Sequence, residues 1–120
     1  MKKNQKLREI INHYGIAKQL KYLQSEVFEL NEAVIKYEES KRNPLDVIVS
    51  FIEPIFAYIN NREPINIKEN IAGELADVMV MLKQIQLHYD IKTETINEIM
   101  LYKIDRQLER IKGESNETNN

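Results

Sequence analysis

The sequence predicts an all-α fold, and three observations support this prediction. Only three glycines and three prolines occur among 120 residues, whereas folds rich in hairpins use both residues freely. Glu, Lys and Leu, which are good helix formers, are abundant. Apolar residues also recur at steps of three and four, a spacing that places them on one face of a helix. We therefore expect a helical bundle of four main helices with one further apolar segment.

The first two expected helices are separated by Gly15. Residues from about Lys3 to Tyr14 carry apolar side chains at helical spacing, and Gly15 is the expected C-cap. The second helix is expected from Ile16 to about Glu39. Its apolar residues form a sustained seam for helix packing: Ile16, Leu20, Leu23, Val27, Leu30, Val34 and Tyr37.

The next segment, from Asn43 to Asn61, is apolar on nearly every side. Asn43 followed by Pro44 is typical of a helix start, and Pro54 lies inside the segment. We expect a kinked or two-piece helix that is buried between other elements or in a subunit interface. A strand over the β-branched residues 47–52 is the alternative.

Two more helices are expected in the second half of the chain. Residues 67–89 repeat the seam pattern, and a last helix is expected from Thr93, as N-cap, to Ile111. The residues expected to face inward on the last helix are Ile96, Met100, Ile104, Leu108 and Ile111. Residues 1–112 are expected to form one domain, and the polar residues 113–120 a disordered tail.

Composition leaves several classes of function without support. The chain has 17 Lys and Arg against 19 Asp and Glu, so no basic field indicates nucleic acid or an anionic membrane as a partner. It has no Cys, and therefore no disulfide and no thiolate metal site. No apolar run reaches membrane length and no signal peptide is visible, so we expect a cytoplasmic protein. Any bound metal must be held by oxygen or imidazole ligands.

Two pairs of acidic residues are the main candidates for a functional site. Glu26 and Glu29 have ExxE spacing on one expected helix, and Glu74 and Asp77 have ExxD spacing on another. Residues three apart are neighbours on a helix surface. Each of the four directly precedes a seam residue, and none has a basic partner three or four residues away. If the helices pack through their seams, the two pairs converge.

Four partly buried carboxylates repel one another and are costly to desolvate unless a cation neutralises them. A hard divalent ion, Mg²⁺ or Mn²⁺, suits such oxygen ligands. The alternative is a solvated acidic helix face. A ferritin-like di-iron site requires Glu-x-x-His, and neither His13 nor His88 follows these acids at that spacing.

The last expected helix carries a basic cluster of Lys103, Arg106 and Arg110, which share one face. Such residues also occur near helix C-termini because they complement the helix dipole. Together with an acidic metal site, the cluster indicates a ligand that carries several phosphates, with metal on some oxygens and basic side chains on others.

Three segments of the chain resemble one family. QLKYLQSEVFELNEAV, GELADVMVML and LYKIDRQLER are similar in order and spacing to the motifs of MazG-type all-α nucleoside triphosphate pyrophosphohydrolases, whose pattern is roughly EExxEL, ExxD and KxxR. The resemblance covers about residues 16–111. It implies Mg²⁺-dependent hydrolysis of nucleoside or deoxynucleoside triphosphates to monophosphate and pyrophosphate, in a homodimer or dimer of dimers.

On this resemblance Glu26, Glu29, Glu74 and Asp77 are the metal ligands, and Lys103 and Arg106 bind phosphate. A metal-bound glutamate, Glu29 or Glu26, would accept a proton from the attacking water, and Tyr22 is the candidate for stacking on the base. Ser25 replaces the first glutamate of the family's EE, Leu101 replaces a frequent Asn, and the segment between the acidic motifs is longer than usual.

Two further hypotheses stay open. The chain could be a non-catalytic helical interaction protein that binds a partner through the apolar residues 45–58. It could also be a pyrophosphohydrolase of the same fold that acts on another substrate, such as phosphoribosyl-ATP.

Overall fold

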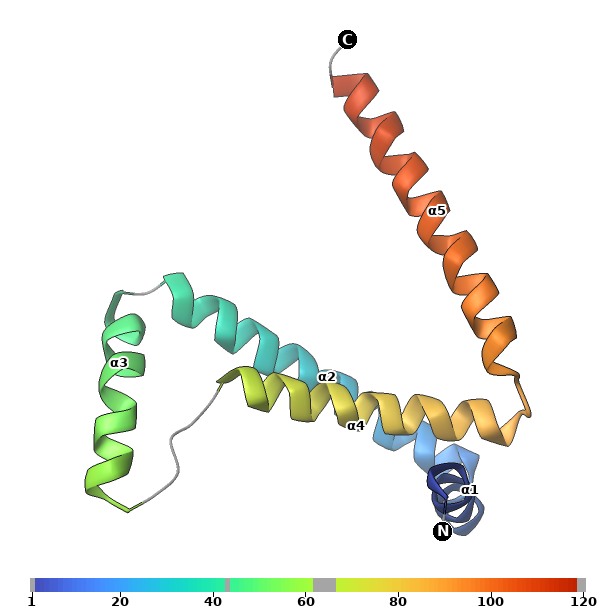
Figure 1. The fold of residues 1–120 in the computed structure, drawn as a ribbon, viewed down its shortest axis with the longest axis horizontal. Coiled ribbons are helices and arrows are strands. Elements are labelled where there is room, and N and C mark those ends of the chain that lie inside the picture. The colour runs from blue at the N-terminus through green and yellow to red at the C-terminus, as the bar shows by residue number, and fades with distance from the viewer. Residues whose placement is uncertain (1, 43, 62–66, 119–120) are drawn as a thin grey trace.

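The computed structural model of the chain describes residues 2–42, 44–61 and 67–118. It contains five helices (Figure 1): α1 (Lys3–Tyr14), α2 (Ile16–Arg42), α3 (Pro44–Ile59), α4 (Ile67–His88) and α5 (Thr93–Thr118). No strand occurs in these ranges, so the all-α prediction is confirmed and the alternative of a strand over residues 47–52 is wrong.

The break between α1 and α2 lies at the predicted glycine. Gly15 has a φ of 82°, and its N–H donates to the carbonyl oxygen of Ile11 at 2.8 Å. A positive φ is costly for residues with a Cβ but not for glycine. The chain therefore ends one helix and starts the next within a single residue.

The core of the molecule lies where α2 and α4 run side by side in opposite directions, with α1 packed against both near the C-terminal end of α4 (Figure 1). The predicted apolar seams supply only part of this contact, because several seam residues, among them Leu20, Val27, Leu75 and Leu82, are exposed. The buried apolar side chains in this three-helix unit are Leu7, Ile11, Ala33, Val78, Met81 and Leu87.

A buried polar pair joins α2 to α4 within this core. The Gln19 side chain is 3% exposed and the Gln84 side chain 1%. Gln19 Nε2 donates to Gln84 Oε1 at 2.6 Å. A buried amide without a partner is costly, so this bond favours one register of α2 against α4.

Arg8 ties α1 to the end of α4. Its guanidinium donates to the carbonyl oxygen of Leu87 at 3.0 Å and to Asp90 Oδ1 at 3.1 Å. The carbonyl groups of a last helical turn have no hydrogen-bond donor within the helix. Arg8 supplies a donor for one of them, the carbonyl of Leu87. Because both side chains are largely exposed, the ion pair itself contributes little to stability.

The third helix, α3, is a single helix that contains Pro54. It packs against α2, and Ala57 is buried. Its large apolar side chains are mostly exposed, Phe51 to 80% and Tyr58 to 85%. The described elements of the chain therefore do not bury α3, so the prediction that it lies between other elements is wrong, and the subunit interface stays a prediction.

The last helix, α5, packs against no other helix of the described chain and extends away from the α2–α4 pair (Figure 1). Ile96 is half-buried, whereas Met100, Ile104, Leu108 and Ile111 are exposed. The prediction that they face a core within the chain is therefore wrong. The pattern identified the apolar face correctly but could not show what it contacts.

Residues 113–118, which the sequence analysis expects in a disordered tail, continue α5 as helix to Thr118. The Thr118 hydroxyl donates to the carbonyl oxygen of Glu114 at 2.7 Å and satisfies one group of the last turn. Residues 119–120 lie outside the described residues.

The arrangement of the helices is open. The Cα radius of gyration is 20.1 Å, whereas a compact domain of this length has about 14 Å. Among the described residues, no helix combines the length and the apolar character that crossing a membrane requires.

Candidate metal centre

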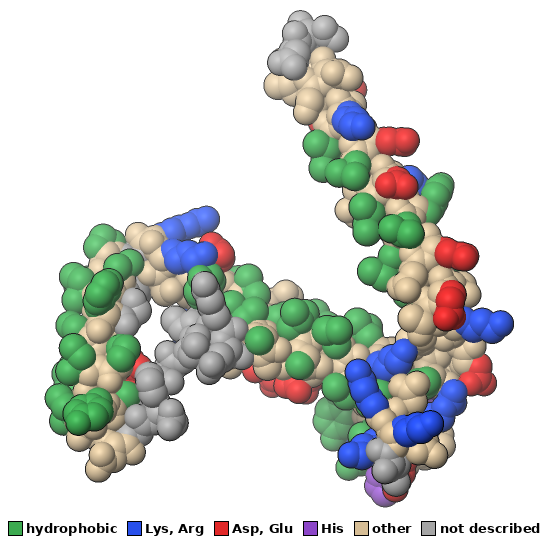
Figure 2. All heavy atoms as spheres, viewed as in Figure 1, with side chains coloured by type: hydrophobic (Ala, Val, Ile, Leu, Met, Phe, Trp, Pro, Cys, Tyr) green, Lys and Arg blue, Asp and Glu red, His purple; other side chains and the backbone are tan. Residues whose placement is uncertain are grey.

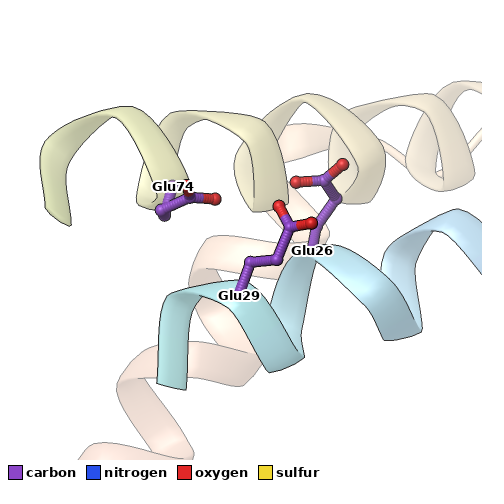
Figure 3. A group of neighbouring side chains, drawn as sticks. All are labelled: Glu26, Glu29 and Glu74. Atoms are coloured by element: carbon purple, nitrogen blue, oxygen red, sulfur yellow. The ribbon is translucent and has the colours of Figure 1, made fainter. Parts of the chain in front are cut away.

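Three of the four predicted acidic residues come together between α2 and α4. Glu26 and Glu29 of α2 and Glu74 of α4 each offer one carboxylate oxygen, and these oxygens all lie within 4.8 Å of one another. Figure 3 shows the three side chains converging from the two helices. Glu26 and Glu74 are half-buried and Glu29 is exposed.

The contact between α2 and α4 positions these side chains. Glu26 directly precedes Val27, and Glu74 directly precedes Leu75. Val27 and Leu75 are themselves exposed, so the half-buried acids, rather than these two seam residues, lie in the contact between α2 and α4. Glu29 is one turn along from Glu26 and adds the third carboxylate.

Asp77, the fourth predicted ligand, is exposed and lies outside this group of three. It is close enough to act electrostatically, because its charge raises the pKa of both Glu26 and Glu74. The structure therefore places Asp77 at the edge of the acidic cluster rather than among its converging oxygens.

Burial and mutual repulsion disfavour the charged forms of two of these carboxyls. Loss of hydration is the largest cause that raises the pKa of Glu26, followed by the negative charges of Glu29, Asp77 and Glu74. Loss of hydration is also the largest cause that raises the pKa of Glu74, and the negative charges of Glu29 and Asp77 raise this pKa further. A divalent cation would reverse this effect, because it stabilises the carboxylates that repel one another.

The chemistry of the donors fits a hard cation. Oε2 of Glu74 is buried and has no hydrogen-bond partner among the described residues. A buried carboxylate oxygen without a partner is costly, and coordination to a metal ion would remove that cost. Only oxygen atoms are offered, which suits Mg²⁺ or Mn²⁺. Glu26, Glu29 and Glu74 would hold the ion, with Asp77 within electrostatic reach.

A cleft of about 600 Å³ opens beside the cluster. Among the described residues, four glutamates and one lysine line it, so an anionic ligand would need cations to offset their charge. Its walls come from α2 and α4, and the lining residues are Phe28, Glu29, Glu32, Ala33, Ile35, Lys36, Glu39, Asn70 and Glu74.

Phe28, Lys36 and Asn70 are cleft residues that sequence reasoning did not single out. Phe28 is 62% exposed although it is a large apolar residue, and Lys36 is the one cation among the described lining residues. A signal existed for two of them, since Lys36 lies seven residues after Glu29 and Asn70 four residues before Glu74. Both spacings keep a residue on the same side of a helix.

The other predicted site residues lie elsewhere. Lys103, Arg106 and Arg110 are on α5, which packs on no other helix in the described ranges. The Arg106 guanidinium instead lies over the Tyr102 ring at 5.8 Å. Tyr22 does not line the cleft, and the Lys18 ammonium lies 5.9 Å from its ring centre.

The histidines are also away from the acidic group. His13 packs edge-on against Tyr14, and His88 packs in the same way against Tyr89. Neither belongs to the convergent group of possible metal ligands in the described chain.

Comparison of the chain with protein-family models, with curated proteins and with solved structures gives no match.

The raised carboxyl pKa values predict a pH-dependent stability that a metal ion should abolish. Above the ordinary carboxyl pKa of 4.5 the folded chain holds more protons at Glu26 and Glu74 than the unfolded chain. Without metal, this contribution to stability is therefore lost as pH rises from 4.5 through the raised pKa values. Bound Mg²⁺ or Mn²⁺ requires the ionised form, so it should raise the melting temperature more at about pH 8 than at about pH 5.

Thermal melts over this pH range, with each ion and with K⁺ at matched ionic strength as control, measure the effect. The same shift with K⁺, or no shift with either divalent ion at any pH, would contradict the metal assignment.

Proposed function

We propose that this chain is a Mg²⁺-dependent hydrolase that converts nucleoside or deoxynucleoside triphosphates to the monophosphate and pyrophosphate. The observation that carries the proposal is the convergence of Glu26, Glu29 and Glu74, with an unpartnered buried oxygen on Glu74. The cleft beside these carboxylates supports it, because two of the three line its wall. The resemblance of three sequence segments to the MazG-type pyrophosphohydrolases supports the same reaction.

The negative charge of the site favours a polyphosphate ligand that binds together with a metal ion. When bound, Mg²⁺ would neutralise part of the triphosphate charge and lower the pKa of water in its coordination shell. The three carboxylates would hold the ion at one end of the cleft, and the Lys36 ammonium would contact phosphate oxygens from the wall. Lys36 is therefore added to the phosphate-binding candidates.

One of the acidic residues would also accept the proton that the attacking water loses. Water adds to the α-phosphorus, its proton passes to Glu29 or Glu26, and the bond to the bridging oxygen breaks so that pyrophosphate leaves. Exposed Glu29 has freer access to water.

The organic part of the substrate has a candidate contact in Phe28. Its exposed ring lies in the lining of the same cleft as Glu29, whereas Tyr22 lies outside that lining. Planar bases stack on aromatic faces, so Phe28 replaces Tyr22 as the favoured base-stacking residue. The cluster of Lys103, Arg106 and Arg110 keeps its proposed role only if another position of α5, or a second copy of the chain, brings it to the cleft.

A panel of normal and modified nucleoside triphosphates tests the proposal. We expect release of pyrophosphate from at least one of them with Mg²⁺ or Mn²⁺, and none when EDTA removes the ion. Phosphoribosyl-ATP belongs in the panel as the alternative substrate of a same-fold enzyme. Release of inorganic phosphate without pyrophosphate, or no product from any compound, would count against the reaction.

A non-catalytic interaction protein is the second candidate, and the exposed apolar surface of α3 favours it. The two functions differ in their response to ligands. Mg²⁺ with a non-hydrolysable triphosphate analogue should raise the melting temperature of an enzyme by mass action on the folded state. A protein that binds only a partner through α3 should show no such shift.

A further inference from the structure

Two exposed apolar side chains form a strip on the α2 wall of the cleft. Phe28 and Ile35 both line the cleft, and both are more than half exposed. They lie seven residues apart, so they share one side of the helix. Phe28 directly precedes Glu29, whose carboxylate belongs to the convergent acidic group. A nucleotide whose phosphates meet a metal ion at Glu29 would therefore place its base on this strip.

Glu32 lies between these two apolar residues on the helix surface. It is four residues after Phe28 and three before Ile35, and side chains at these spacings are neighbours. Glu32 lines the cleft and is exposed. Lys36 is four residues after it, yet among the described residues Glu32 makes no ion pair and no hydrogen bond. The Glu32 oxygens are therefore available to a base that stacks on Phe28.

A carboxylate at this place distinguishes bases by their exocyclic groups, because it can only accept hydrogen bonds. Cytosine, adenine and guanine each carry an amino group that donates. Uracil and hypoxanthine carry a carbonyl oxygen where cytosine and adenine carry the amino group. That oxygen lies next to the ring N–H of the base, so it repels a carboxylate that approaches this N–H. Glu32 would therefore favour a base with an amino group over its deaminated form.

The other polar side chains of the cleft do not produce this preference. Asn70, on the α4 wall, both donates and accepts, so it suits either kind of base. Lys36 only donates, but it lies seven residues after Glu29 and so continues the line of the metal ligand rather than that of Phe28. The surroundings are mainly acidic, and Figure 2 shows acidic side chains along the lower edge of the α2–α4 pair.

We infer that Glu32 selects nucleotides whose base carries an exocyclic amino group, which are those of cytosine, adenine and guanine, over those of uracil and hypoxanthine. This inference rests on the proposed function, because it names the substrate class of the same cleft. Glu32 is a specificity-determining residue and would not touch the reacting phosphorus. Nucleotides damaged by deamination are therefore expected to be the poorer substrates.

The first test compares kcat/KM within matched sets at one Mg²⁺ concentration: dCTP with dUTP, and dATP and dGTP with dITP. The sugar, the phosphates and the ring size are the same within each set, so the ratio reports the edge of the base. We expect the amino nucleotide to be favoured about 10-fold, as for one hydrogen bond to a charged group. Ratios near one, or a preference for dUTP and dITP, would overturn the inference.

Glu32→Gln should bring these ratios to within about twofold of one, since an amide both donates and accepts. Glu39→Gln is the matched control, because it removes the same charge from the same cleft lining. Glu39 lies eleven residues after Phe28, about 16 Å along the helix, which is beyond the reach of a base stacked there. It should leave the ratios unchanged. Equal loss of selectivity in both variants would attribute it to overall charge and refute the role of Glu32.

A binding assay separates this inference from the proposed reaction. Calorimetry with Mg²⁺ and the α,β-imido analogues of dCTP and dUTP measures selection without hydrolysis. Selective binding without pyrophosphate release from any nucleotide would refute the reaction and support the role of Glu32. Pyrophosphate release with equal kcat/KM and equal binding within each set would refute that role and leave the reaction standing. No binding of either analogue would refute both.

Discussion

Glu29→Gln and Glu74→Gln are each expected to lower Mg²⁺-dependent pyrophosphate release by about 10²–10³-fold, since loss of a metal ligand removes several kcal/mol of stabilisation of the transition state. Glutamine keeps the size of the side chain but offers a weaker, neutral oxygen. Both residues contribute an oxygen to the group that converges within 4.8 Å. Steady-state assays with the best substrate of the nucleotide panel measure the loss.

Glu38→Gln is the matched control for these variants. It removes a carboxylate from the same helix, but Glu38 pairs with Lys41 at 3.5 Å and does not line the cleft. Its activity should stay within about twofold of the native value, because exposed ion pairs contribute little. Full activity in a Glu29→Gln plus Asp77→Asn double variant would rule out the assigned site.

The same substitutions should not unfold the protein. The carboxyl groups repel one another in the absence of metal, so a neutral amide at Glu74 removes repulsion. Melting temperatures without metal that are equal to or above the native value would therefore separate a loss of chemistry from a loss of structure.

Gln84→Leu is expected to lower the free energy of unfolding by about 1–3 kcal/mol, because it leaves the buried Gln19 amide without its partner. The two side chains are 3% and 1% exposed, and their hydrogen bond is the link between α2 and α4 within the core. Denaturation by urea at one fixed protein concentration measures the change, since association would otherwise alter the apparent stability.

The double variant Gln19→Leu plus Gln84→Leu is the control. It replaces both partners by apolar side chains of similar size, which is close to neutral in many cores. We expect it to recover most of the stability that Gln84→Leu loses. If the double variant is less stable than the single one, the pair is not the reason for the loss.

Local features of the fold could be predicted from the sequence because they depend on neighbouring residues. The bounds of α1 agree with those predicted, and the break at Gly15 follows from the one residue there that adopts a positive φ without strain. The apolar face of α5 was also identified correctly. Its environment was not, because a periodic pattern shows that a face needs cover but not which surface covers it.

For the candidate site, too, the sequence predicted the residues but not their full arrangement. Spacing alone predicted that Glu26, Glu29, Glu74 and Asp77 would converge if the seams packed. The structure brings three of them within 4.8 Å and leaves Asp77 at the edge, a difference that depends on how far each side chain projects between the helices. The cleft, with Phe28 and Lys36 in its wall, could not be predicted, because it is formed jointly by two helices.

The sequence by itself determined the helical class, the main helices and the two acidic pairs, since each follows from contacts within a few turns of one helix. Only the tertiary structure decided that Gln19 meets Gln84, that the acids meet beside a cleft, and that α5 leaves the α2–α4 pair. Those outcomes depend on contacts between residues far apart in the chain. Their energies come from helix packing and from hydrogen bonds between helices, such as the one from Gln19 to Gln84, which no local pattern of residues encodes.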